Sequence, residues 1–142
     1  MSTRGLWGFI QGENYTANYK HSDAYPSGLG AEFWSACKTG ELGGYGIEEE
    51  SIDFIRDSLF CEWAYFYDRD TGVFEIWKGF QKVPDPQNPF GQEKDDDGYY
   101  PCRRIFQGPV ELLSFDIFEE TGDIERKLVE INRHQKLTTI LK

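Results

Sequence analysis

The segment FCEWAYFYDRDTGVFEIWKGF, residues 60–80, decides the predicted fold because its pattern is that of a β-hairpin. Two runs rich in aromatic and β-branched residues, 60–67 and 73–80, flank the polar stretch DRDTG. Bulky side chains of these kinds favour strands, and a short polar stretch containing Gly72 favours a turn between them. Residues 60–80 therefore predict two antiparallel strands.

A second hairpin is predicted near the N-terminus. Residues 5–11 (GLWGFIQ) carry bulky side chains on both faces, as in a strand that is covered on both sides. Residues 12–14 form a turn, and apolar or aromatic residues then alternate with polar ones. Because successive side chains of a strand point to opposite faces, one set is predicted to face inward: Tyr15, Ala17, Tyr19 and His21.

Together these patterns predict an α+β fold in which an antiparallel sheet of about four strands packs against helices. A further short strand is predicted at residues 103–106. Residues 31–38 and 49–59 have helix-compatible composition, and Ile52, Ile55 and Leu59 have the spacing of an apolar stripe. Asp123 is a plausible N-cap for a C-terminal helix, residues 123–142, whose basic residues lie near its end.

The length of 142 residues predicts a single domain, 1–142. Within it, residues 82–98 contain three prolines followed by charged residues, which predicts a long, exposed, acidic loop. The aspartates at 95–97 are expected to form a mobile, solvated tip.

Composition limits the functional classes. The net charge of −10 repels nucleic-acid phosphate, so direct nucleic-acid binding is not expected. The three cysteines form no CxxC pair and the N-terminus resembles neither a signal peptide nor a membrane span, so a cytoplasmic protein without membrane contact is expected. With two histidines and no P-loop or GxGxxG motif, neither a metal nor a cofactor is predicted.

The decapeptide HSDAYPSGLG, residues 21–30, reads either as part of a reaction centre or as a turn. It combines an imidazole, a carboxylate and a phenol, in His21, Asp23 and Tyr25, with the flexible Gly28 and Gly30. Glycine lets the backbone approach a ligand, and a phenol can donate a hydrogen bond. Asp, Pro and Gly are also the ordinary residues of turns, so the motif alone leaves both readings open.

The first hairpin adds a second group of candidates. Its antiparallel register places Thr3 and Arg4 at the same end of the sheet as His21, where a guanidinium could bind a phosphate. Glu62 lies between apolar neighbours and could act as a general base or hold a ligand hydroxyl. An ion pair of Arg4 with Asp23 or Glu62, and a solvent-exposed Glu62, are the structural alternatives. Glu75 also lies in an apolar strand, and Glu62 is the stronger candidate of the two.

Three sequence blocks together resemble a family of bacteriophage and bacterial proteins that has no established activity. They are TRGLWGF (3–9), YKHSDAYPSGLG (19–30) and DSLFCEWAYFYDRDTGVFEIWKGFQ (57–81). Family members carry T-R-G-x-x-G-F, Y-N-H-x-D-S-Y-P-x-G-L-G and S-L-F-C-E-W-x-Y, and Lys20 and Ala24 stand where the family commonly has Asn and Ser. The matching residues are Thr3, Arg4, His21, Asp23, Tyr25, Pro26, Gly28, Gly30, Glu62 and Trp63.

The resemblance implies a phage-linked setting, in which small acidic proteins counter host defence by removing a nucleotide signal or by binding a defence protein. The leading expectation is therefore a protein that binds, or also hydrolyses, a phosphorylated nucleotide-like ligand. The expected ligand-binding residues are Thr3, Arg4, His21, Tyr25, Gly28, Gly30 and Trp63; for an enzyme, the catalytic residues are His21, Asp23 and Glu62.

Two further hypotheses remain open. An acidic inhibitor could imitate DNA towards a host defence enzyme through the carboxylates at 48–53 and 93–97. Alternatively, Ser2 could serve as an N-terminal nucleophile of a small hydrolase. The sequence also leaves a homo-oligomer open.

Overall fold

The computed structural model describes residues 2–43, 50–119 and 124–141, and it describes side chains of the last helix as far as Gln135. Five strands form one sheet: β1 (Gly5–Gln11), β2 (Asn14–Lys20), β3 (Trp63–Asp68), β4 (Val73–Lys78) and β5 (Arg103–Pro109). The α-helices are α1 (Ala31–Thr39), α2 (Phe115–Glu119) and α3 (Ile124–Leu141). Short turns of helix are η1 (Pro26–Gly30), η2 (Ile52–Arg56) and η3 (Val110–Leu112).

The sheet is mixed and has the strand order β2-β1-β3-β4-β5. Both predicted hairpins are confirmed, because β1 pairs with β2 and β3 pairs with β4 in antiparallel register. The expected short strand is also confirmed, as β5 pairs with β4. The prediction of about four strands, all antiparallel, is wrong: there are five, and β1 and β3 run parallel. The segment between the hairpins, which contains α1, crosses over and returns the chain in the same direction.

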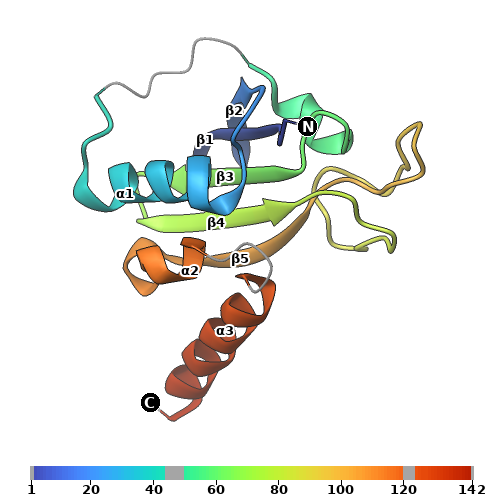
Figure 1. Ribbon diagram of the computed structural model, residues 1–142. Coiled ribbons are helices and arrows are strands. Elements are labelled where there is room, and N and C mark those ends of the chain that lie inside the picture. The colour runs from blue at the N-terminus through green and yellow to red at the C-terminus, as the bar shows by residue number, and fades with distance from the viewer. Residues whose placement is uncertain (1, 44–49, 120–123, 142) are drawn as a thin grey trace.

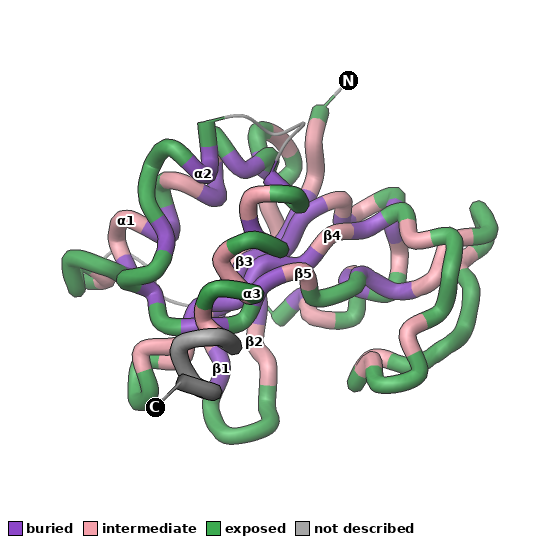
Figure 2. The backbone as a smooth tube through the Cα atoms, turned by 90° about the horizontal axis from the view of Figure 1, so that it is seen from below, coloured by how far each residue is buried: buried purple, intermediate pink, exposed green. Residues whose placement is uncertain are grey.

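Each face of the sheet has its own core. On one face, Figure 1 shows α1 and α2 in front of the strands; there Phe33 of α1 packs against Phe74 of β4, and Trp34 of α1 packs against Phe118 of α2. The other face buries Phe66 and Trp77 together with Ile55 of η2. Figure 2 shows buried residues concentrated along β3 and β4 and a largely exposed chain beyond β4. The sheet is therefore covered on both faces, as the bulky residues of β1 predict.

The helix predictions are confirmed in part. α1 matches the predicted 31–38 helix, and α3 is the predicted C-terminal helix, with Ile124 and Leu128 buried. Asp123, its expected N-cap, lies outside the described residues. The helix expected at 49–59 is wrong within the described part, because only η2 forms there and Leu59 is 55% exposed. Asp57 is extended and accepts a hydrogen bond from the Leu59 amide, which ends the helical turn.

The predicted loop at residues 82–98 contains no strand or helix and extends away from the sheet (Figure 1). It is nevertheless tied down, because the Asp95 carboxylate accepts hydrogen bonds from the amides of Ser58, Asp97 and Tyr99 at 2.9–3.0 Å. The expectation of a solvated aspartate tip therefore needs correction for Asp95, whereas Asp96 and Asp97 are exposed. Among the described helices, none has the length and apolar composition needed to cross a lipid bilayer.

Candidate functional site

The end of the sheet at which β1 and β3 begin brings several predicted site residues together. Gly5 pairs with Lys20, so the expected placement of Arg4 at the same sheet end as His21 is confirmed. The parallel pairing of β1 with β3 adds Glu62, whose amide donates to the Arg4 carbonyl at 2.9 Å. The hairpin register was enough to predict that Arg4 and His21 share a sheet end. The position of Glu62 beside Arg4 depends on the crossover between the hairpins, which the sequence did not reveal.

A cavity of about 470 Å³ opens beside Arg4 and Glu62. Its size falls within the range of about 300–1,000 Å³ that is usual for small-molecule sites. The lining combines an arginine, a carboxylate, hydroxyls and apolar groups: Ser2, Arg4, Ser58, Leu59, Glu62 and Phe80. We call this space the Arg4 cavity.

The Arg4 guanidinium is available for an anion. Among the described residues it forms no ion pair, and its terminal carbon lies 5.7 Å from the centre of the Phe60 ring. The expected alternative, an ion pair with Asp23 or Glu62, is therefore not found in the described part of the chain. A cation–π contact with an aromatic ring uses none of the guanidinium N–H groups, which can therefore still donate to oxygen acceptors.

Phe80 supports the cavity in an unusual backbone conformation. It has a φ of 56°, which is uncommon for a residue with a bulky side chain. Its amide donates to the Ser58 hydroxyl at 2.9 Å, and its ring packs edge-on against Tyr99. The surrounding contacts thus hold a strained aromatic residue, 42% exposed, at the wall of the Arg4 cavity.

His21 is not part of the lining of the Arg4 cavity and does not face inward. It follows β2, is exposed, and contacts Tyr19 through a hydrogen bond of 2.9 Å between Nδ1 and the phenol oxygen. The prediction of an inward-facing His21 is therefore wrong, because β2 ends at Lys20. In the described part of the chain, no hydrogen bond joins the proposed catalytic residues His21, Asp23 and Glu62 to one another.

The decapeptide 21–30 forms a turn that leads into α1. Asp23 has a φ of 60° and its carbonyl accepts a hydrogen bond from the Leu29 amide. A Cβ atom on Gly28 would lie 2.5 Å from that carbonyl, and one on Gly30 would lie 2.9 Å from the Tyr65 ring. The Tyr65 hydroxyl in turn donates to the Ala24 carbonyl at 2.9 Å. These glycines thus have a packing role in addition to the ligand contact predicted for them.

The remaining predicted ligand residues lie in different surroundings. Thr3 accepts a hydrogen bond from the Ala24 amide through its carbonyl, and Tyr25 is 36% exposed. Trp63 is only 3% exposed, and the Lys78 ammonium lies over its ring. Its indole is therefore enclosed by protein atoms instead of being presented to a base.

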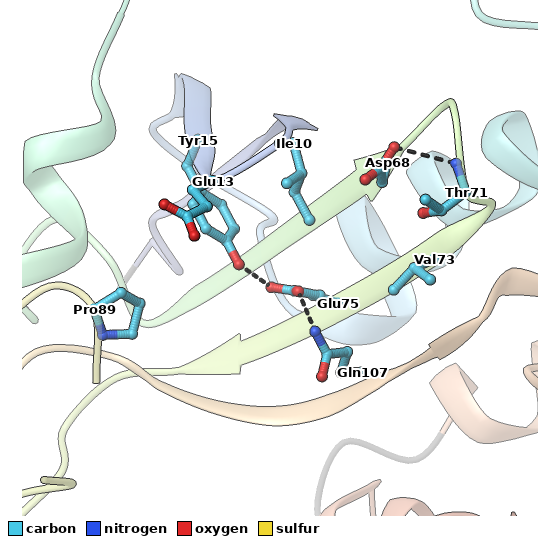
Figure 3. A pocket seen from close by; sticks show the side chains of 10 residues that line it. Ile10, Glu13, Tyr15, Asp68, Thr71, Val73, Glu75, Pro89 and Gln107 are labelled. Atoms are coloured by element: carbon cyan, nitrogen blue, oxygen red, sulfur yellow. Dashed lines mark hydrogen bonds between the residues drawn. The ribbon is translucent and has the colours of Figure 1, made fainter. Parts of the chain in front are cut away.

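The structure reveals a second cavity, of about 610 Å³, which is lined by residues of both hairpins (Figure 3). Glu75 of β4 lies beside it with only 2% exposure. We call it the Glu75 cavity. Two further carboxylates and no cationic side chain are found in its lining: Ile10, Gly12, Glu13, Tyr15, Asp68, Thr71, Val73, Glu75, Pro89 and Gln107.

Donors from three strands satisfy the Glu75 carboxylate. Oε1 accepts hydrogen bonds from the Tyr15 hydroxyl at 2.7 Å and the Trp77 indole at 2.9 Å. Oε2 accepts from Gln107 at 3.1 Å and lies 3.4 Å from the Arg104 guanidinium. Burial raises the pKa of the Tyr15 phenol well above its usual value, and the bond to Glu75 and its negative charge add to the shift.

Sequence reasoning ranked Glu62 above Glu75 as a candidate site residue. In the structure Glu75 is buried, whereas Glu62 is only partly buried. The sequence signal that pointed to both glutamates was an acidic residue among apolar neighbours, and it does not distinguish Glu62 from Glu75. Only the cross-strand partners distinguish them, because Glu75 pairs with Gln107 and its neighbour Trp77 pairs with Arg104. Those polar residues on a partner strand were the missed indication that a buried carboxylate could be satisfied.

No family model, curated protein or solved structure matches the chain.

Proposed function

We propose that the protein binds a phosphorylated, nucleotide-like small molecule in the Arg4 cavity. The observation that carries this proposal is the Arg4 guanidinium, which forms no ion pair among the described residues and lies at a cavity of suitable size. A guanidinium binds two phosphate oxygens at once through parallel N–H groups. Phosphate is therefore the ligand group that best matches Arg4.

The other walls of the Arg4 cavity support a ligand that is more than an inorganic anion. Leu59 and Phe80 are exposed apolar side chains that would contact the flat faces of a base. Glu62 repels phosphate but accepts hydrogen bonds from hydroxyl groups, which a ribose supplies. A phosphate at Arg4 and a sugar hydroxyl at Glu62 would use the two charged groups without conflict.

The Glu75 cavity does not suit the same ligand. Its lining has three carboxylates, Glu13, Asp68 and Glu75, and contains no cationic side chain, although Arg104 pairs with Glu75 at 3.4 Å from outside that lining. Phosphate oxygens placed there would meet like charges, which raises the free energy of binding. The larger of the two cavities is therefore not the proposed phosphate site.

Binding is the favoured activity, and hydrolysis is not part of the proposal. The His21 Nδ1 atom is engaged by Tyr19, and the described residues provide no hydrogen-bonded set of His21, Asp23 and Glu62. Ser2, the nucleophile of the hydrolase hypothesis, does line the Arg4 cavity. Mass spectrometry of a nucleotide recovered after long incubation separates the two activities, and accumulation of a dephosphorylated product would contradict pure binding.

In the phage-linked setting implied by the resemblance, the ligand would be a nucleotide signal of host defence that the protein sequesters. Calorimetric titration with linear and cyclic adenosine monophosphates, adenosine and inorganic phosphate tests the chemistry. We expect a monophosphate to bind, and Arg4→Gln to weaken its binding by about 10- to 100-fold, the range for a charged hydrogen bond. No binding of any nucleotide to the folded protein would contradict the proposal.

Two variants sharpen the titration. Glu62→Gln should weaken a ribose-bearing nucleotide but strengthen inorganic phosphate, because it removes both a hydroxyl acceptor and a negative charge. Arg69→Gln is the matched control, since Arg69 also lies over a phenylalanine ring, Phe9, but follows the far end of β3. An equal effect of Arg4→Gln and Arg69→Gln would show that general surface charge, and not the Arg4 cavity, governs binding.

A further inference from the structure

Two cysteines that are distant in sequence touch each other in the core. The sulfur atoms of Cys61 and Cys102 lie 3.4 Å apart, and both residues are fully buried. Cys61 lies two residues before the start of β3, and Cys102 directly precedes β5. The Cys102 thiol also lies 3.3 Å from the Cys61 carbonyl, so the two segments are packed closely on the sheet face opposite α1.

From this contact we infer that Cys61 and Cys102 form a site of reversible disulfide formation. A disulfide bond is about 2.05 Å long, so the two sulfurs need to approach by about 1.4 Å. Cys37, the third cysteine, is buried in the core on the other face of the sheet, next to α1. The contact therefore selects one pairing out of the three that the sequence allows.

The oxidant would be a low-molecular-weight disulfide such as oxidised glutathione. The thiolate of one cysteine attacks a sulfur of this oxidant, which forms a mixed disulfide and releases one glutathione thiolate. The thiolate of the other cysteine then attacks the protein sulfur of the mixed disulfide and releases the second glutathione. Two electrons pass from the protein to the oxidant, and the two protons leave with the released glutathione molecules.

Burial makes the exchange slow in the closed structure. Neither sulfur is accessible, and burial raises the pKa of the Cys61 thiol well above its usual value, with the Cys102 contact adding to the shift. The reactive thiolate is therefore scarce until the segments around Cys61 and Cys102 open locally. The reaction should accelerate at low urea concentrations that leave the protein globally folded.

The bridge would close a covalent loop around the second hairpin and the acidic loop. That loop contains about 40 residues, a length at which a disulfide strongly restricts the unfolded chain. It would join the segment that leads into β3 to the segment that leads into β5. The oxidised protein should therefore unfold at a temperature higher by about 10 °C.

The test uses the wild-type chain in buffers of reduced and oxidised glutathione. Samples are quenched with acid, alkylated in denaturant, weighed intact and mapped by proteolysis. In oxidising buffer we expect two thiols to be lost, a peptide pair linking Cys61 to Cys102, and the higher unfolding temperature. Three alkylated thiols after equilibration, a persistent glutathione adduct or a pair involving Cys37 would each overturn the inference.

Single-cysteine variants provide the controls. Cys37→Ser should still form the bridge, whereas Cys102→Ser should remain unbridged at the same glutathione ratio. If Cys102→Ser does not fold, the comparison of the reduced with the oxidised wild-type protein still tests the inference. It measures free thiols and the unfolding temperature on one and the same sequence. An oxidised wild-type protein that unfolds at the same or a lower temperature would contradict the stabilising role of the bridge.

Discussion

Tyr15 on the edge strand β2 donates a 2.7 Å hydrogen bond to Glu75 on β4, although β1 and β3 lie between these strands in the sheet. The contact requires the sheet to curl so that β2 approaches β4 across one face. Gly8 of β1 is part of the reason, because a Cβ atom there would lie 1.9 Å from the Thr16 carbonyl of β2. The curled sheet thus provides the donors that a buried carboxylate needs.

The first prediction concerns this hydrogen bond. Tyr15→Phe removes one donor from the buried Glu75 carboxylate and should lower the free energy of unfolding by about 2 kcal/mol, the usual scale for a hydrogen bond to a charged group. Urea denaturation measures the change. Tyr25→Phe is the control, because the Tyr25 hydroxyl forms no hydrogen bond among the described residues, and it should change stability by less than about 0.5 kcal/mol. Equal effects would show that the Tyr15 bond is not significant.

Local patterns predicted the hairpins, the fifth strand and the long helices, because each depends on residues close together in sequence. The parallel pairing of β1 with β3 could not be read in this way, since period-two alternation is the same for either strand direction. Its origin is the crossover through α1, a long-range feature. The sequence therefore indicated the elements better than their arrangement.

The candidate site was predictable to a similar extent. Arg4 and His21 share a sheet end because a hairpin register fixes their positions. The Tyr15 donor to Glu75 was not predictable, because Tyr15 lies 60 positions away on a strand that is not adjacent to β4. The contact of Cys61 with Cys102 likewise joins segments 41 positions apart. Such relationships arise from packing between elements, for which a single sequence carries no periodic signal.

The second prediction separates the packing role of the decapeptide from its ligand role. Gly30→Ala would place a Cβ atom 2.9 Å from the buried Tyr65 ring and should destabilise the protein by about 1–3 kcal/mol through overpacking. Gly43→Ala is the matched control, because among the described residues no atom outside the neighbouring chain positions lies within 4 Å of a Cβ there. Thermal and urea denaturation measure both. A Gly30→Ala protein as stable as the Gly43→Ala protein would show that Gly30 is not required for packing.

The third prediction follows from the buried Tyr65 phenol. Burial raises its pKa well above the ordinary value of about 10, and the charges of Cys61 and Glu62 add to the shift. Above pH 10 the unfolded chain loses this proton while the folded chain retains it, so the unfolded state binds fewer protons. Stability should therefore be fully present below pH 10 and decrease as the pH rises above it.

Urea denaturation between pH 8 and pH 11 measures this decrease. Tyr65→Phe should reduce the slope above pH 10, although it also removes the hydrogen bond to the Ala24 carbonyl and lowers stability at every pH. Because the Tyr15 pKa is also raised, Tyr15→Phe should reduce the slope in the same direction. A slope that is identical in wild type and both variants would contradict the assignment of the alkaline loss to these phenols.

The last prediction tests whether the carboxylates of the loop 82–98 contribute to stability or to nucleotide binding. Asp95 cannot act as a free phosphate mimic, because its carboxylate accepts three backbone hydrogen bonds, one of them from Ser58. Asp95→Asn keeps one oxygen but loses the second acceptor, so the Ser58 amide should lose its partner at a cost of about 1–2 kcal/mol. Asp97→Asn changes an exposed side chain and should alter stability by less than about 0.5 kcal/mol.

Urea denaturation distinguishes the two variants, and calorimetry with adenosine monophosphate should give unchanged affinity for Asp97→Asn. If Asp97→Asn abolished nucleotide binding while Arg4→Gln preserved it, the acidic loop and not the Arg4 cavity would be the functional surface.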